Sequence, residues 1–463
     1  MSDIKKDDGT PFKNFILFAL PRTAASMVLT VIDFAIIFLY VEGYGKDYKP
    51  LEWLGIPLYF AFFVGIATAC GKLSIAASQF SMGYLSDSTR SKKLGKRKPF
   101  MIISAPILAI AFTFLLLPTF FLGSRPDFIT LFLWLLIFDM IFQFFYGSLT
   151  TPYQSWMAEQ FEVHERTTAA AWQNIFNYVG TGLAVLFTVI IIPQTMADFS
   201  NTRAIGPIYT VIAIIFAIIV ISLFYTTALL LPVEKEPPIK INLKKDMKEL
   251  WKDKNYIHVC MLIGIASLTW SMITGLMLGY FQVVLKLDNM LVSAGGLIIG
   301  VLGSLFIWKK VIDTIGKKKA LTIIFIWAIV TIPFAGILPL IPFEDFTVPA
   351  LLLMIIVAAS LGGWFLFPYI LYADLAENEE RTGEEAEMKA GLYTGFPSIL
   401  LNLFQAFGLF LVGLILSTPT VPGEDYSMGY LLWAPIGSVI LVVALLYLRK
   451  YITLDFEWEA ERK

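Results

Sequence analysis

The sequence predicts an all-α membrane protein with twelve transmembrane helices arranged in two bundles of six. Three observations point to this fold class: the apolar composition, the length of the apolar runs, and the distribution of Lys and Arg. Hydrophobic residues make up 57% of the 463 residues and charged residues only 15%, whereas soluble domains carry about 25% charged residues. So few charges cannot cover a soluble surface. The net charge of −1 provides no overall field that would attract nucleic acid.

Twelve apolar runs are long enough to cross a hydrocarbon core of about 30 Å, which takes about 20 helical residues. The runs lie at residues 15–42, 55–85, 99–123, 128–157, 168–193, 206–232, 257–284, 291–312, 320–341, 349–374, 390–417 and 428–449. The first run is too long for the apolar part of a signal peptide, so no cleavable signal is expected.

The basic residues predict the orientation of the spans. Of the 35 Lys and Arg residues, 28 fall in the tails, loops and adjoining span ends on one side of the predicted membrane and five in the opposite loops. The remaining two, Arg22 and Lys72, lie deeper within spans. Because cytoplasmic loops carry an excess of Lys and Arg, both termini are predicted to be cytoplasmic. We expect an integral protein of the cell membrane.

The chain is predicted to divide into two halves. Residues 1–232 would form the N-terminal bundle, 233–256 a cytoplasmic linker, and 257–463 the C-terminal bundle with its tail. The linker is basic and amphipathic, so it is either a helix on the membrane surface or a solvated connection. The loops after spans 2 and 8 contain the similar stretches GKRK and GKKK, 221 residues apart (95 against 316). A six-plus-six duplication would leave such a pattern.

Three segments carry a family resemblance. The stretch MGYLSDSTRSKKLGKRKPF (82–100) resembles the loop between helices 2 and 3 of the major facilitator superfamily. Its form is similar to that of the glycoside–pentoside–hexuronide:cation symporters, and residues 150–176 and 369–395 resemble the helix 4–5 and 10–11 regions of that family. The resemblance implies the major facilitator fold and transport of a small polar solute, a sugar or glycoside, by alternating access. Two alternatives stay open: a transporter of lysolipids or other amphiphiles, and a non-transporting membrane receptor or scaffold.

The coupling ion is predicted from where the sequence departs from this family. Cation-coupled members carry acidic residues on helix 2, where this chain has Ile75 and Gln79, and on helix 4, where it has Thr150. No lysine stands near residues 400–402, where some members carry one on helix 11. Proton coupling is therefore predicted in preference to sodium coupling.

Charges inside spans are costly and usually mark functional sites. Asp33, Lys72 and Asp139 lie in spans 1, 2 and 4 at a similar predicted depth, and they are the candidate coupling residues. The alternative is a static ion pair that only locks these helices together.

Neutral and aromatic side chains dominate the rest of the predicted transport path. Sugars are held by amide and hydroxyl hydrogen bonds and by aromatic rings. The candidate substrate-binding residues are Arg22, Gln79, Tyr146, Thr150, Gln173, Asn174, Trp364, Tyr393 and Asn402.

The loop motif also suggests gating residues. Gly83 would allow close helix approach, and Asp87 would bond to Arg90 or to a helix N-terminus of the other bundle. Asp313 stands in the corresponding loop of the second half. Alternatively, these charges only set the topology.

Enzymatic signatures are absent from the sequence, including GxxxxGK[ST], GxSxG, HExxH and GxGxxG. The two cysteines and two histidines show no metal-ligand spacing. The chain is therefore predicted not to be an enzyme and to need no metal or cofactor. Its expected partners are the solute, a proton and membrane lipids, and it is expected to be a monomer.

Overall fold

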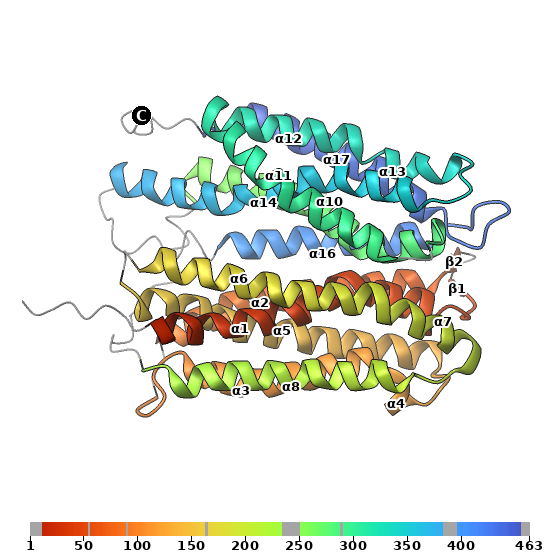
Figure 1. Ribbon diagram of the computed structural model, residues 1–463, viewed down its shortest axis with the longest axis horizontal. Helices are drawn as coiled ribbons and strands as arrows, with labels where there is room; N and C mark the ends of the chain where they lie inside the picture. The colour runs from red at the N-terminus through yellow and green to blue at the C-terminus, as the bar shows by residue number, and fades with distance from the viewer. Residues whose placement is uncertain are drawn as a thin grey trace, which may run out of the picture.

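The computed structural model describes residues 12–53, 56–88, 91–162, 165–233, 251–287, 290–382 and 396–454. Within these residues, twelve helices are long and apolar enough to cross a membrane, which confirms the predicted count. In Figure 1 the long helices run roughly along the long axis of the molecule, in a lower and an upper group.

The lower group in Figure 1 is the N-terminal bundle, in which α1 packs against α6 and α8, and α5 packs against α2 and α3. Asp127 caps the start of α5 by accepting a hydrogen bond from the backbone N–H of Thr130. The helices of this bundle are α1 (Phe12–Phe38) with the π-helical segment η1 (Leu39–Tyr44), α2 (Phe60–Ser88), α3 (Lys98–Leu116), α4 (Pro118–Leu122), α5 (Phe128–Gln160), α6 (Arg166–Leu186) with η2 (Phe187–Ile191) and α7 (Ile192–Thr202), and α8 (Pro207–Leu230).

The upper group is the C-terminal bundle, in which α10 packs against α16 and α17, and α14 packs against α11 and α12. Asp253 caps the start of α10 in the way that Asp127 caps α5. The helices are α10 (Lys254–Gly279) with η3 (Tyr280–Val284), α11 (Met290–Ile315), α12 (Lys317–Thr331), α13 (Phe334–Ile337) with the short 3₁₀ turn η4 (Leu338–Leu340), α14 (Thr347–Thr382), α16 (Pro397–Leu416) and α17 (Gly429–Tyr451).

The two ends of the molecule differ in charge. We call the end where α2 and α11 finish the basic end, because the Lys-rich stretches at 92–98 and 317–319 lie there. At the opposite end, which we call the far end, a hairpin of β1 (Leu51–Trp53) and β2 (Ile56–Leu58) follows η1 (Figure 1). That the basic end faces the cytoplasm stays a prediction, as do the exact bundle limits. Most of the predicted linker, residues 234–250, lies outside the described residues.

Three predicted boundaries were wrong at the far end. The second span begins at Phe60 rather than at residue 55, because the β-hairpin occupies the residues before it. The fifth span does not stop at residue 193 but continues through η2 and α7 to Thr202. The third span breaks at Pro118, since proline has no N–H for the helical hydrogen bond.

A shared construction links the first helix of each bundle. Helices α1 and α10 contain 27 and 26 residues, and each continues directly into a π-helical segment. These segments start 241 residues apart (39 against 280), and the second residue of one and the first of the other are Tyr40 and Tyr280. Because π-helical turns are rare, this correspondence supports the six-plus-six repeat.

Each of these tyrosines donates a hydrogen bond near a helix broken by proline. Tyr40 donates to the carbonyl of Leu115 (3.0 Å), just before the break at Pro118. Tyr280 donates to the carbonyl of Ala335 (2.6 Å), just after Pro333. Carbonyls near such a break lose helical partners and must be satisfied by other donors. The repeat is therefore visible in how backbone hydrogen bonds are satisfied.

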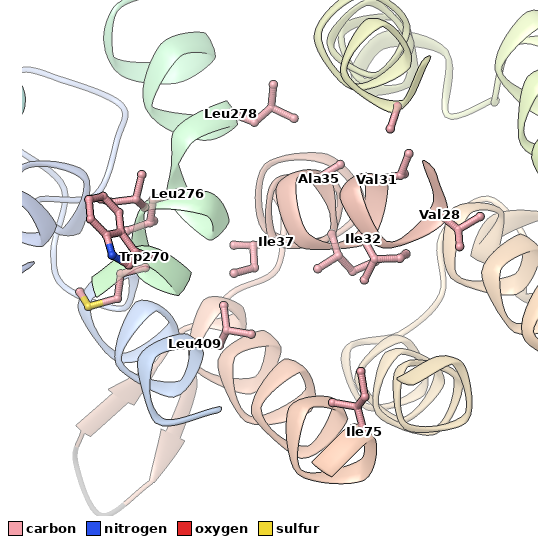
Figure 2. Packing of buried hydrophobic residues seen from close by; sticks show 14 of the residues in the cluster. Val28, Val31, Ile32, Ala35, Ile37, Ile75, Trp270, Leu276, Leu278 and Leu409 are labelled. Atoms are coloured by element: carbon pink, nitrogen blue, oxygen red, sulfur yellow. The ribbon is translucent and has the colours of Figure 1, made fainter. Parts of the chain in front are cut away.

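The bundles meet along a seam formed by α1 and α2 on one side and α10 and α16 on the other. A Cβ added to Gly65 would lie 2.6 Å from the Cα of Gly413, so the backbones of α2 and α16 touch there. Farther along the seam, Ile37 and Leu409 converge on Gly275 of α10, and Figure 2 shows these two side chains in the space between the four helices. This part of the seam is closely packed and apolar.

Candidate functional site

A buried ion pair lies in the N-terminal bundle between α1 and α2. The Nζ of Lys72 donates to Oδ1 of Asp33 at 2.8 Å. The side chain of Lys72 is 7% exposed and that of Asp33 is 28% exposed, so the pair is partly uncovered on the aspartate side. The predicted proximity of these two residues is therefore found, and the lysine is already neutralised by one carboxylate.

Asp139 on α5 lies beside this pair without joining it. It is 1% exposed, and neither of its carboxyl oxygens has a hydrogen-bond partner. Its Oδ2 occupies the space that a Cβ would need at Gly71, the neighbour of Lys72 on α2. Helices α1, α2 and α5 thus bring all three predicted coupling residues together, but they leave Asp139 unpaired.

Helix α6 holds the second polar group of the N-terminal bundle. Gln173 donates from Nε2 to the hydroxyl of Tyr153 (2.9 Å), which donates to the carbonyl of Phe18 (2.5 Å). Arg22 of α1 is half-buried and lies within electrostatic range of Tyr153. Asn174, the next residue along α6, is exposed. These four side chains lie nearer the basic end than the Asp33–Lys72 pair does. Arg22 and Gln173 among them are partly exposed, and Asn174 is exposed.

Two of the predicted binding residues on α5 have local roles. Thr150 is buried and donates its hydroxyl to the backbone carbonyl of Tyr146, one turn earlier (2.8 Å). The ring of Tyr146 is buried and stacks on Phe142. Both side chains belong to the packing of the N-terminal bundle here.

The remaining predicted binding residues lie on the C-terminal side. Asn402 of α16 donates to the side-chain oxygen of Gln79 of α2 (3.0 Å), so these two amides meet across the seam as a pair. Trp364 is buried against Phe325 of α12, inside the C-terminal bundle. Tyr393 lies outside the described residues.

The GKRK stretch closes the basic end of the N-terminal bundle. Lys96 and Arg97 both bind Glu159 near the end of α5, at 3.0 and 2.7 Å. Lys98 donates to the carbonyl of Leu231 (2.6 Å) after α8. All three cations are buried, so this basic stretch serves packing within one bundle rather than the membrane surface. The sequence did not predict the role of Glu159 as the partner of these cations, although the segment that contains it, 150–176, carries part of the family resemblance.

The residues predicted to act in gating lie at the basic end. Asp87 binds Arg97 of its own bundle. Arg90 lies outside the described residues, so its bond with Asp87 stays a prediction. Burial alone would lower the pKa of Arg97, but Glu159 and Asp87 raise it above its usual value and keep the guanidinium charged. A Cβ at Gly83 would meet Thr151 at an ordinary 3.4 Å, so the helix approach there does not require glycine. Asp313 is exposed and takes part in none of the ion pairs of the described residues.

Comparison with protein families decides the class of protein. Residues 17–452 match the family described as MFS/sugar transport protein. The chain belongs to this family. Comparison with curated protein sequences found no match.

Solved structures show the same fold for this family member at low sequence identity. The D-xylose–proton symporter is 14% identical, with a TM-score of 0.69 over 96% of this chain and 98% of that one. The nucleoside transporter NupG is 14% identical, with a TM-score of 0.63 over 95% and 99%. A bacterial homologue of the human lysosomal transporter Spinster is 13% identical, with a TM-score of 0.64 over 96% and 98%. Family and fold are those of transporters in a membrane, which confirms the predicted fold class.

Proposed function

We propose that this transporter moves a small polar organic solute, a sugar or glycoside, by secondary active transport coupled to protons rather than sodium. One observation carries the coupling proposal: the buried, unpaired carboxyl group of Asp139 beside the Asp33–Lys72 pair. A carboxylate without a partner is costly to bury, whereas a protonated carboxyl is neutral. A group in this position can hold a proton in one state and release it in another.

The solute class rests on polar groups that are at least partly exposed. Arg22 and Asn174 at the basic end of the N-terminal bundle, and the half-buried Gln79 that accepts from buried Asn402 on the seam, offer donors and acceptors to hydroxyl groups. Sugar sites are built from a few such groups among apolar walls. The family description and the D-xylose–proton symporter with the same fold support the same class.

Uptake into proteoliposomes tests the proposal. A panel of sugars, glycosides, nucleosides and lysolipids is offered with an inward proton gradient, with an inward sodium gradient, or with neither. We expect one polar solute to accumulate under the proton gradient alone. Accumulation of a lysolipid would support the amphiphile alternative, and accumulation driven only by sodium would contradict proton coupling.

A further inference from the structure

Asp139 and Gln143 on α5 place buried hydrogen-bond acceptors beside the same residue of α2, Gly71. Both carboxyl oxygens of Asp139 and the side-chain oxygen of Gln143 are buried without a hydrogen-bond partner. The two residues are four apart, so they lie on one face of the helix. Both side chains pack against Gly71, where a Cβ would overlap Asp139 and would lie 3.2 Å from Cγ of Gln143.

The neighbouring charged and titratable groups do not satisfy these acceptors. Helix α1 contributes Asp33, η1 contributes Tyr40, and α2 contributes Cys70 and Lys72. Lys72 donates to Asp33, and Tyr40 donates to the carbonyl of Leu115. Helix α3, which also packs on α5, has no titratable side chain beyond its first residue, and α4 has none. Helix α6 touches α5 more sparsely, and its titratable residues are Arg166 and Tyr178.

We propose that Asp139 and Gln143 form the site that holds the transported proton. The proton resides on the Asp139 carboxyl group, which donates a hydrogen bond to Oε1 of Gln143 in the space left by Gly71. One proton thus satisfies an acceptor on each side chain and removes the uncompensated charge. That this proton is transported rests on the function proposed above, but its presence does not.

Release of the proton links the site to the ion pair. When the proton leaves, the Asp139 carboxylate competes with Asp33 for the ammonium group of Lys72. Lys72 therefore has one carboxylate partner in the loaded state and two candidates in the unloaded state. A metal ion is a poorer occupant, because hard cations take six or more oxygen ligands and the described residues contain no carboxylate cluster suited to a metal.

Infrared difference spectroscopy tests the site without requiring transport. Purified wild-type protein should show the carbonyl band of a protonated carboxyl group, and Asp139→Asn should lack this band. Gln143→Leu should keep the band but shift it to higher frequency, because the hydrogen bond is lost. Gln405→Leu, which changes an amide in the C-terminal bundle, should leave the band in place.

The outcomes separate this site from the proposed function. Absence of the band in wild type, its loss on adding sodium, or no shift in Gln143→Leu would each overturn the proton site. Failure of every solute in the uptake panel would instead refute the proposed function and leave the spectroscopic result standing.

An independent observation concerns the seam between the bundles. Two side-chain hydrogen bonds cross it within the described residues: Gln79–Asn402 toward the basic end, and Glu42–Tyr430 at the far end. The hydroxyl of Tyr430 donates to Oε1 of Glu42 at 2.9 Å.

The far-end bond lies in closely packed surroundings. Glu42 belongs to η1, and Tyr430 is fully buried at the start of α17. The Tyr430 hydroxyl occupies the space that a Cβ would need at Gly279, the residue before η3. Lys46 and Asp425 are the other charged groups near Glu42. The bond therefore connects η1 of the N-terminal bundle to α17 of the C-terminal bundle, beside the residue that precedes η3.

The geometry points to the Glu42–Tyr430 bond as a latch that holds the far end closed. Opening of the far end must separate η1 from α17, and this bond is the polar contact that breaks. The apolar contacts of Ile37 and Leu409 with Gly275 beneath it would separate in the same movement.

Cysteine labelling tests the latch. In a background with Cys70→Ser and Cys260→Ser, Leu409→Cys is exposed to a membrane-impermeant thiol reagent from the far-end side. Tyr430→Phe should increase the labelling rate several-fold. Tyr280→Phe removes an equally buried hydroxyl that bonds within one bundle, so it should leave the rate unchanged. Equal labelling in the parent and Tyr430→Phe, or an equal increase in Tyr280→Phe, would refute the latch.

Discussion

The two bundles share a construction but differ in buried charge. Among the side chains whose burial the structure describes, every buried charged one lies in the N-terminal bundle: Lys72, Lys96, Arg97, Lys98, Asp139 and Glu165. The buried polar groups of the C-terminal bundle are hydroxyls and the amide of Asn402. The two halves therefore differ in the chemistry that they can bury. This asymmetry is the reason why the function proposed above assigns proton binding to the N-terminal bundle.

The largest expected effect comes from removing the unpaired charge. Asp139→Asn places a neutral amide where we expect a protonated carboxyl, so the protein should fold normally. Proton-driven accumulation of the solute should fall at least tenfold, while solute exchange at equal concentrations continues. The measurement is uptake with and without a pH gradient in proteoliposomes.

Asn402→Ala is the control for that experiment in the uncharged bundle. It removes an amide from the seam, so it should weaken solute uptake while leaving its dependence on the pH gradient intact. Concentrative uptake by Asp139→Asn with an unaltered pH profile would show that Asp139 is not the proton carrier.

The second effect is on stability and concerns the basic end. Glu159→Ala leaves Lys96 and Arg97 buried without their shared carboxylate, which should cost about 3–5 kcal/mol. Asp313→Asn, at the corresponding loop of the C-terminal bundle, changes an exposed group and should alter stability by less than about 0.5 kcal/mol. Thermal unfolding of the purified variants in detergent measures both. Similar losses would mean that the two basic loops are equivalent after all.

The sequence was sufficient to predict the twelve spans, because the length of an apolar run directly reflects the thickness of the membrane. It also placed Asp33, Lys72 and Asp139 together, because residue counting along helices gives depth. Which side chains bond to one another was harder to predict from the sequence. Asp87 binds Arg97, which is brought back by the turn at Gly95, and no sequence pattern predicted this contact. Glu42 and Tyr430, 388 residues apart, carry no pattern that predicts their contact.

The third prediction concerns the unequal exposure of the ion pair. Asp33→Asn removes the carboxylate bonded to the nearly buried ammonium of Lys72. While Asp139 holds its proton, this change should lower the free energy of unfolding by about 3 kcal/mol. Lys72→Met leaves Asp33, which is less enclosed by the protein, and should lower the free energy of unfolding by only about 1 kcal/mol. The double variant should resemble Lys72→Met, since no buried cation remains. Chemical or thermal unfolding of the two single variants and the double variant measures these changes. Equal losses of stability in the two single variants would indicate that Asp33 and Lys72 are equally exposed.

The smallest effect tests what the bundles still have in common. Tyr40→Phe and Tyr280→Phe each remove one hydroxyl that donates to a backbone carbonyl near a proline break. Each substitution should lower the free energy of unfolding by about 1 kcal/mol, because a buried carbonyl loses its hydrogen-bond donor. Since neither residue is charged, the two costs should agree within about 0.5 kcal/mol and should not change with pH between 6 and 8, where tyrosine stays protonated. Asp139 lies within electrostatic range of Tyr40. A much larger, pH-dependent loss of stability for Tyr40→Phe alone would mean that this tyrosine affects the protonation of Asp139. The difference in buried charge between the bundles would then extend to the construction that they share.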